Sequence, residues 1–164
     1  MKKSGLNHLS LQDIKKYKYG KPYISGFYHY NISHAGDYVV LVYSDNSVGV
    51  DIEQIQKTDI SHFQKVLSSD ENQWIKDTGS MRRFYHVWTR KEAVVKAHGI
   101  GLNSRLNQID TTTNPTFFDD QLFYHKEIDI DSDYVCHVAS TSLIEEIEVK
   151  YVDFLTDNLL TGYV

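Results

Sequence analysis

The stretch YVVLVYSDNSVGVDIE, residues 38–53, decides the fold class, because it holds two extended runs around a short polar break. Residues 38–43 are β-branched and aromatic, as is typical of a strand. Ser-Asp-Asn-Ser has the chemistry of a turn, and the extended pattern resumes at residues 48–53. We therefore predict a β-hairpin over residues 38–53. In its second strand, Val50 and Ile52 point to one face while Asp51 and Glu53 point to the other.

Two helical stretches follow this region, at residues 68–78 and 84–99, and Gly99 is a natural C-terminal stop for the second. Three further strands are expected at residues 121–128, 132–140 and 144–155. Strands on both sides of two helices predict an α+β fold.

The composition predicts a folded, β-rich protein, since 41% of the 164 residues are hydrophobic, 13% are aromatic and only 2 are proline. The net charge of -5 removes the general attraction to phosphate backbones, so a nucleic-acid partner is not expected. The sequence shows neither a secretory signal nor a membrane span. Its single cysteine, Cys136, lies in an alternating run and is expected to be a buried strand residue. These features predict a reduced, cytoplasmic protein.

The segment NISHAGD, residues 31–37, concentrates polar side chains between aromatic and apolar runs. One interpretation is a turn, because Asn, Ser and Asp bond to nearby backbone groups and Gly36 can adopt a positive φ. The other is that Ser33 and His34 contact a ligand. Local sequence leaves both open.

Two pairs of charged residues carry candidate chemistry. Asp51 and Glu53 share one face of a strand and could share a divalent cation such as Mg²⁺, although such a pair is also common on solvated surface. Glu92 and Lys96 lie four residues apart in a helix, where they could simply form a stabilising ion pair. If Glu92 meets Asp51 and Glu53, their repulsion would be relieved by a metal ion or by protonation.

The second helical stretch carries two further signals. Thr89 and Glu92 match a capping box if the helix begins at Thr89. Trp88, Glu92 and Val95 fall on one side, so this face is expected to be partly buried. If this face is buried, helix stabilisation alone does not explain an ion pair between Glu92 and Lys96.

Four blocks in this order resemble the 4'-phosphopantetheinyl transferases of the surfactin-synthetase-activating type: GKP at 20–22, NISHAG at 31–36, VGVDIE at 48–53 and WTRKEAVVKAHGIGL at 88–102. The resemblance implies transfer of the 4'-phosphopantetheine arm of coenzyme A to a serine of an apo acyl or peptidyl carrier protein, with Mg²⁺. It also implies two α+β subdomains related by a pseudo-twofold axis, with coenzyme A in the cleft between them.

The resemblance assigns roles to matching positions. Asp51, Glu53 and Glu92 match the metal site, and Glu92 could also be the base. Catalytic roles fall to Glu92, Lys96 and His34, and coenzyme A contacts fall to six residues: Gly20, Lys21, Pro22, Ser33, His34 and Lys96. Arg90 and Lys91 are flanking positions to which the resemblance gives no role.

Only 19 residues precede Gly20, so we expect a shortened N-terminal subdomain at residues 1–50 and a C-terminal subdomain with the acidic site at residues 51–164. A basic cluster could hold the 3'-phosphate of coenzyme A or be exposed surface: Lys2, Lys3, Lys15, Lys16 and Lys18. Three explanations stay open: a compact enzyme, one completed by self-association, or a remnant with weakened activity.

Two other function classes compete with the transferase. One is a non-catalytic module that binds coenzyme A or a carrier protein. The other is a metal-dependent nuclease, which fits less well because Glu92 and Lys96 have helical spacing and the chain is acidic. Residues 57–76 with Arg82 and Arg83 are the expected docking surface for an acidic carrier helix.

Overall fold

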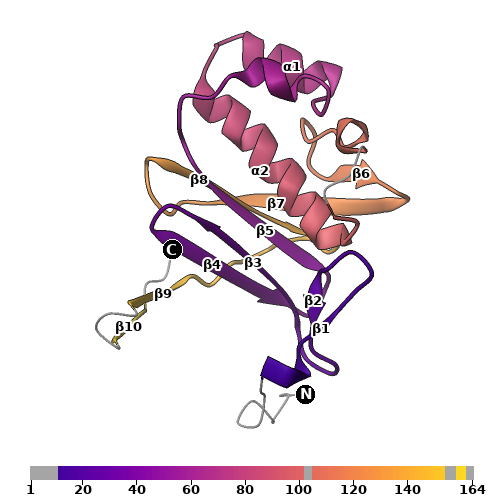
Figure 1. Cartoon of the computed structure of the whole chain (residues 1–164), viewed down its shortest axis with the longest axis vertical. Coiled ribbons are helices and arrows are strands. Elements are labelled where there is room, and N and C mark those ends of the chain that lie inside the picture. Colours follow the sequence, from indigo (N-terminus) through magenta and orange to yellow (C-terminus); the bar gives the residue numbers. More distant parts are fainter. Residues whose placement is uncertain (1–10, 102–104, 154–157, 162–164) are drawn as a thin grey trace.

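The computed structural model describes residues 11–101, 105–153 and 158–161, and it confirms the α+β class (Figure 1). The α-helices are α1 (Ser69–Lys76) and α2 (Met81–His98), and short 3-10 helices lie at Leu11–Asp13, Ile60–Phe63 and Leu106–Gln108. The strands, in chain order, are β1 (Lys15–Lys16), β2 (Pro22–Tyr23), β3 (His29–Ala35), β4 (Tyr38–Ser44), β5 (Val48–Gln54), β6 (Thr116–Phe118), β7 (Gln121–Ile128), β8 (Tyr134–Ser140), β9 (Lys150–Asp153) and β10 (Asn158–Thr161).

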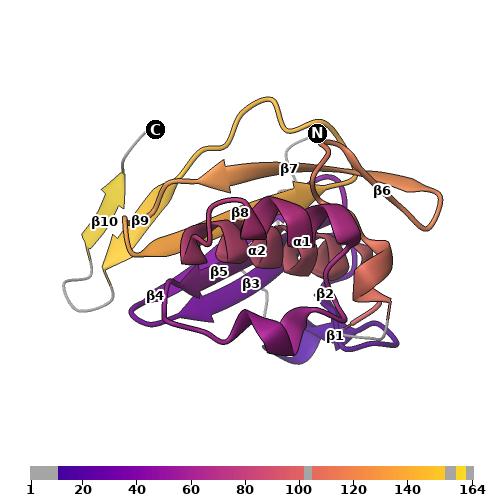
Figure 2. The ribbon, with the colours of Figure 1, turned by 90° about the horizontal axis from the view of Figure 1, so that it is seen from above.

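The central sheet has the strand order β5-β8-β7-β6 and is antiparallel throughout. Helix α2 packs across β5 and β8, and α1 lies beside it, as Figure 2 shows from above. At Gly49 a Cβ atom would collide with backbone atoms of Ala93 and Ala97. The absence of a side chain at Gly49 therefore lets α2 approach β5 closely, which brings Asp51 beneath the helix.

The predicted hairpin over residues 38–53 is wrong. Strand β4 pairs with β3 instead, through a two-residue turn at Gly36 and Asp37 in which Gly36 has a φ of 52°. Strand β5 pairs with β8, so the two runs of the predicted hairpin belong to different sheets. Gly-Asp between two extended runs is itself a hairpin signal, and it lies within NISHAGD.

Strand β3 lies along the edge of β5 that β8 leaves open, and polar side chains connect the two strands. The Asn31 side-chain oxygen accepts a hydrogen bond from the amide of Val50 at 3.0 Å. The Ser33 hydroxyl accepts one from the amide of Ile52 at 3.3 Å. These side chains satisfy strand-edge amides that would otherwise be buried without partners. Asn31 and Ser33 of NISHAGD therefore each have a structural role in joining β3 to β5.

Several local predictions have clear outcomes. The strands at 121–128 and 132–140 correspond to β7 and β8, and Cys136 is buried as expected. The predicted strand at 144–155 is wrong for residues 144–149, since β9 begins at Lys150, and residues 154 and 155 lie outside the described part.

Helix α2 begins at Met81, so Thr89 is not a helix cap; its hydroxyl donates to the carbonyl of Tyr85 within the helix. Gly99 ends α2 with a φ of 87°, as predicted.

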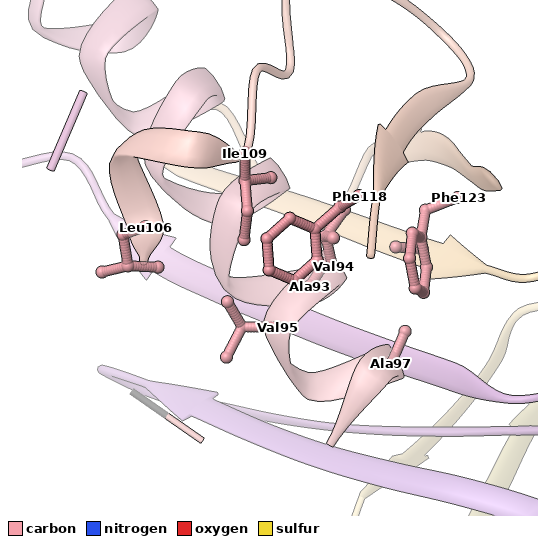
Figure 3. Packing of buried hydrophobic residues seen from close by; sticks show 9 residues of the cluster. Ala93, Val94, Val95, Ala97, Leu106, Ile109, Phe118 and Phe123 are labelled. Carbon is pink, nitrogen blue, oxygen red and sulfur yellow. The ribbon is translucent and has the colours of Figure 1, made fainter. Parts of the chain in front are cut away.

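Apolar side chains fill both sides of the central sheet. On one side, residues of α2 pack with Leu106, Ile109, Phe118 and Phe123 (Figure 3). On the other side, Val48, Val50 and Ile52 pack against the inward face of the β3–β4 hairpin. The alternation predicted for β5 is therefore confirmed, and its polar face is turned toward α2.

Candidate active site

The candidate site lies where β5 passes beneath α2. Asp51 and Glu53 come from β5, and Glu92 and Lys96 come from α2. Asp51 and Glu92 are buried, with 4% and 6% of their surfaces exposed, while Glu53 is half-buried. The predicted burial of this helix face is confirmed, and the four charged side chains gather between one strand and one helix.

Lys96 is the central cation of this cluster. Its Nζ lies 2.6 Å from Oδ1 of Asp51 and donates to Oγ of Ser33 at 3.0 Å and to the carbonyl of Val50 at 3.1 Å. Ser33 also donates to Oδ1 of Asp51 at 3.1 Å. Among the described acidic side chains, Lys96 forms its ion pair with Asp51 on β5 and not with Glu92 one turn earlier. The ion pair expected within the helix is thus replaced by one that joins α2 to β5.

Two carboxylates of this cluster have unused oxygen atoms. Oδ2 of Asp51 and Oε1 of Glu92 are buried and accept no hydrogen bond from any described residue. Oε1 of Glu53 accepts a hydrogen bond from Nε1 of Trp88 at 3.2 Å. Burying a carboxylate oxygen of this kind lowers the stability of the fold unless a cation or a hydrogen-bond donor reaches it.

The protonation of the three acids reflects this environment. Burial raises the pKa of Glu92 to about 7, and the charges of Asp51 and Glu53 push it in the same direction. Burial also raises the pKa of Asp51, although Lys96 and Ser33 oppose the change. For Glu53, burial and then the charge of Asp51 raise the pKa. The three groups therefore repel one another electrostatically across the site.

This donor set fits a hard divalent cation. Carboxylate oxygens are the ligands that Mg²⁺ prefers, and Mg²⁺ usually keeps several waters and takes few protein ligands. A closed protein cage brings its ligand atoms close together. Among the described residues, the ligand atoms of a different cluster lie within 4.8 Å of one another, so the three carboxylates form a more open set. An open site of acids suits an ion that also binds water and phosphate oxygens.

The predicted coenzyme A contacts fall into two places. Lys21 immediately precedes β2, and its side chain reaches the C-terminal end of α2. There its Nζ donates to the carbonyl of Ala97 at 2.6 Å and to Oγ of Ser47 at 3.1 Å. Burial lowers the pKa of Lys21 to about 8. Gly20 and Pro22 flank it, so this segment lies next to the turn of α2 that carries Lys96.

His34 is separated from the cluster. Side chains alternate along β3, so Ser33 points toward Asp51 while His34 lies on the opposite, exposed face with Ile32. The structure therefore brings Ser33 to the acidic cluster and leaves His34 on the other side of its strand. The catalytic role of His34 stays a prediction.

Lys91 is a buried residue whose role the sequence did not reveal. It is 0% exposed, and its Nζ lies 2.7 Å from Oε2 of Glu71 and donates to the carbonyls of Leu106 and Ile109. Glu71 also forms the capping box of α1 with Ser68. Ser-x-x-Glu at 68–71 was the readable signal for that cap, whereas the box expected at Thr89 does not form.

The predicted basic surfaces are partly engaged within the chain. Arg82 donates to the carbonyl of Ser132 at 2.8 Å, and Arg83 donates to that of Trp74 at 2.8 Å. Lys15, Lys16 and Lys18 are exposed, while Lys2 and Lys3 lie outside the described residues. In the described part of the chain, no helix is both long and apolar enough to cross a membrane.

Comparisons of the sequence with known proteins find similar ones. The sequence model of the 4'-phosphopantetheinyl transferase superfamily matches residues 47–139, which hold Asp51, Glu53, Glu92 and Lys96. The chain is 33% identical over 106 residues to 4'-phosphopantetheinyl transferase gsp of Aneurinibacillus migulanus, covering 63% of this chain and 45% of that protein. It is 37% identical over 93 residues to 4'-phosphopantetheinyl transferase psf-1 of Bacillus pumilus, covering 54% of this chain and 40% of that protein. The matched part thus spans less than half the length of these relatives.

Proposed function

Because the chain belongs to the 4'-phosphopantetheinyl transferase superfamily, we propose that it transfers the 4'-phosphopantetheine arm of coenzyme A to a serine hydroxyl of an apo acyl or peptidyl carrier protein. The serine oxygen forms a bond to the β-phosphorus of coenzyme A, and the phosphoanhydride bond breaks to release adenosine 3',5'-bisphosphate. The observation that carries this proposal is the group of three buried or half-buried carboxylates, two of which have unused buried oxygens, beside a lysine held between strand and helix.

Asp51, Glu53 and Glu92 are the residues that would hold Mg²⁺. When bound, Mg²⁺ supplies charge neutralisation for the pyrophosphate and the departing bisphosphate. Oδ2 of Asp51 and Oε1 of Glu92 are buried and have no hydrogen-bond partner in the part of the chain that the structure describes, which supports this assignment.

Glu92 is also the proposed proton acceptor. In the metal-free chain burial raises the pKa of Glu92 to about 7, and a bound cation would favour the carboxylate form that can accept a proton. In the proposed step, Glu92 takes the proton of the carrier serine, directly or through a water molecule. Lys96 donates to a phosphate oxygen, exchanging one of its present contacts with Ser33, Val50 or Asp51.

The coenzyme A site would extend from this cluster to the end of α2. Gly20, Lys21 and Pro22 lie at that end, where the ammonium of Lys21 is available to an anion if it leaves the carbonyl of Ala97. Ser33 lies beside Lys96 and would contact the pyrophosphate with it. We place the reaction in the cytoplasm, because the single cysteine, Cys136, is buried and forms no internal disulfide.

The proposal is tested by intact-mass analysis of a panel of apo carrier proteins incubated with this protein, coenzyme A and Mg²⁺. We expect a mass gain of one phosphopantetheine on at least one carrier, dependent on Mg²⁺. Asp51→Ala should slow it by roughly 10²-fold or more, because metal charge stabilisation contributes several kcal/mol.

Asp45→Ala is a matched control, since it removes an exposed aspartate shortly before β5. A carrier with its target serine changed to alanine should gain no mass. If no carrier is modified while isothermal titration still shows coenzyme A binding, the chain is a non-catalytic binding module and the transferase proposal is wrong.

A further inference from the structure

A second group of metal-ligating side chains lies on the side of α2 that faces β7 and β8. It consists of His86 on α2, Glu127 on β7 and His137 on β8, and one ligand atom of each lies within 4.8 Å of the others. Among the described residues it is the one such group of histidine, cysteine or acidic side chains. None of the three has a role in the proposed transfer.

The hydrogen bonds of His137 fix which ring nitrogen carries its proton. Thr89 donates its only hydroxyl proton to the carbonyl of Tyr85 at 2.7 Å, so its oxygen must accept from Nδ1 of His137 at 2.8 Å. Arg90 can only donate, and its Nε lies 3.2 Å from Nε2 of His137. Both contacts require a proton on Nδ1 and a lone pair on Nε2. The chain Tyr85–Thr89–His137 therefore orients the ring as outer contacts orient a metal-bound histidine.

His86 and Glu127 face each other with complementary free positions. Nδ1 of His86 is buried and has no hydrogen-bond partner among the described residues, and it lies 3.6 Å from Oε2 of Glu127. Arg82 lies 3.6 Å from the other oxygen, Oε1. Glu127 can therefore present Oε2 to an ion while Arg82 holds Oε1.

We propose that His86, Glu127 and His137 form a metal site for a first-row transition ion such as Zn²⁺, which would join α2 to β7 and β8. Two imidazoles and one carboxylate are a common ligand set for Zn²⁺, usually completed by water. Water can reach a fourth position because 40% of the Glu127 side chain is exposed. The inference stands apart from the proposed transferase activity and its acidic cluster.

An ion that binds Nε2 of His137 requires Arg90 to move, because Nε of Arg90 donates to the lone pair of that nitrogen. The guanidinium of Arg90 already lies 6.0 Å from the centre of the Trp74 ring, so this ring is next to it when it moves. Burial lowers the pKa of His86, and that of His137 to about 2, so both rings are neutral at neutral pH. Neutral imidazole is the form that binds metal.

The test is titration of the full chain with Zn²⁺ in competition with a chromophoric chelator, together with the visible spectrum of the Co²⁺-loaded protein. We expect one Zn²⁺ site with nitrogen ligands and strong Co²⁺ absorption of the four- or five-coordinate kind. His86→Gln and Glu127→Gln should each weaken Zn²⁺ at least tenfold and remove the Co²⁺ absorption. Both residues are partly exposed, so we expect the two variants to fold. Circular dichroism verifies that they do.

Two controls separate this site from other places that could bind Zn²⁺. His62→Gln removes a histidine whose side chain is 79% exposed, and Asp51→Asn impairs the acidic cluster; neither should change the Zn²⁺ affinity of this site. The proposal is overturned if the chain binds no Zn²⁺, if binding survives in both His86→Gln and Glu127→Gln, or if it is lost in Asp51→Asn.

Discussion

Lys91 and Glu92 are neighbours in α2, both are buried, and their surroundings are opposite in kind. Lys91 enters a closed network with Glu71, in which both oxygens of Glu71 are used. Oε1 accepts from the amide and the hydroxyl of Thr111, both at 2.9 Å, and Oε2 accepts from the amide of Ser68 and from Lys91, both at 2.7 Å. This network joins α1, α2 and the segment before β6.

Glu92 faces the other way, into a cluster that is incomplete. Its Oε1 and Oδ2 of Asp51 have no donors among the described residues, and the charges of Asp51 and Glu53 act on it together with that of Lys96. A buried charge that serves stability is usually fully hydrogen-bonded, whereas one left short of partners indicates a site that something else completes. The two networks thus contrast a fully hydrogen-bonded buried charge with an incompletely hydrogen-bonded one within one helix turn.

Lys91→Met is expected to have the largest effect on stability. It removes the cation from a closed buried pair, which typically costs about 3–5 kcal/mol in the free energy of unfolding. Urea denaturation would measure the loss, and Lys76→Met, at an exposed lysine of α1, is the matched control. A loss no larger than that of the control would show that the network is not structural.

Changing the two glutamates to glutamine should have effects of opposite sign. Glu71→Gln weakens the closed network and is expected to cost about 2–4 kcal/mol. Glu92→Gln removes a repelled carboxylate, so the metal-free protein should gain about 1–2 kcal/mol at pH 8. Denaturant unfolding of both variants with excess chelator tests this. If both variants lost stability equally, the contrast between the networks would be wrong.

The pH dependence of stability sharpens the contrast. The pKa of Glu92 is raised by folding to about 7, so the folded state binds this proton more tightly than the unfolded chain. Stability from Glu92 is therefore complete below its unfolded pKa and is lost as the pH rises through about 7. Without metal, the wild type should lose about 1–2 kcal/mol more than Glu92→Gln between pH 5.5 and 8. Parallel profiles for the two proteins would contradict this.

Ser33 and His34 extend the same test to neighbouring residues of β3. Ser33→Ala leaves the amide of Ile52 without its acceptor, so we expect a loss of about 1–2 kcal/mol. His34→Ala changes an exposed side chain and should cost less than about 0.5 kcal/mol. Thermal unfolding compares them. Carrier modification by His34→Ala then tests its predicted catalytic role separately from folding.

The smallest expected effect is optical. Nε1 of Trp88 donates to Oε1 of Glu53, so an ion bound by Glu53 should change the environment of the indole. We expect Mg²⁺ to change the tryptophan emission by a few per cent, with no change in Trp88→Phe. A change of the same size in Trp88→Phe would assign it to Trp74 instead.

The sequence by itself determined the α+β class and both helices, because these depend on local periodicity: Gly99 ends α2, and the alternation in β5 turns Asp51 toward the helix. The resemblance to a known family predicted that Asp51, Glu53, Glu92 and Lys96 form one site, and β5 and α2 carry all four. The hairpin over residues 38–53 failed because pairing partners depend on distant strands. Extended residues alone do not specify whether β5 pairs with β4 or with β8.

Only the tertiary structure decided which buried charges were satisfied. Ser33, Asp51 and Lys96 are separated by at least 18 residues, and Glu71 meets Thr111 across 40. No local pattern could distinguish the closed network of Lys91 from the open one of Glu92, because both residues belong to the same helical run. Burial and hydrogen bonding are set by what packs against each face of α2, and that is a property of the folded chain.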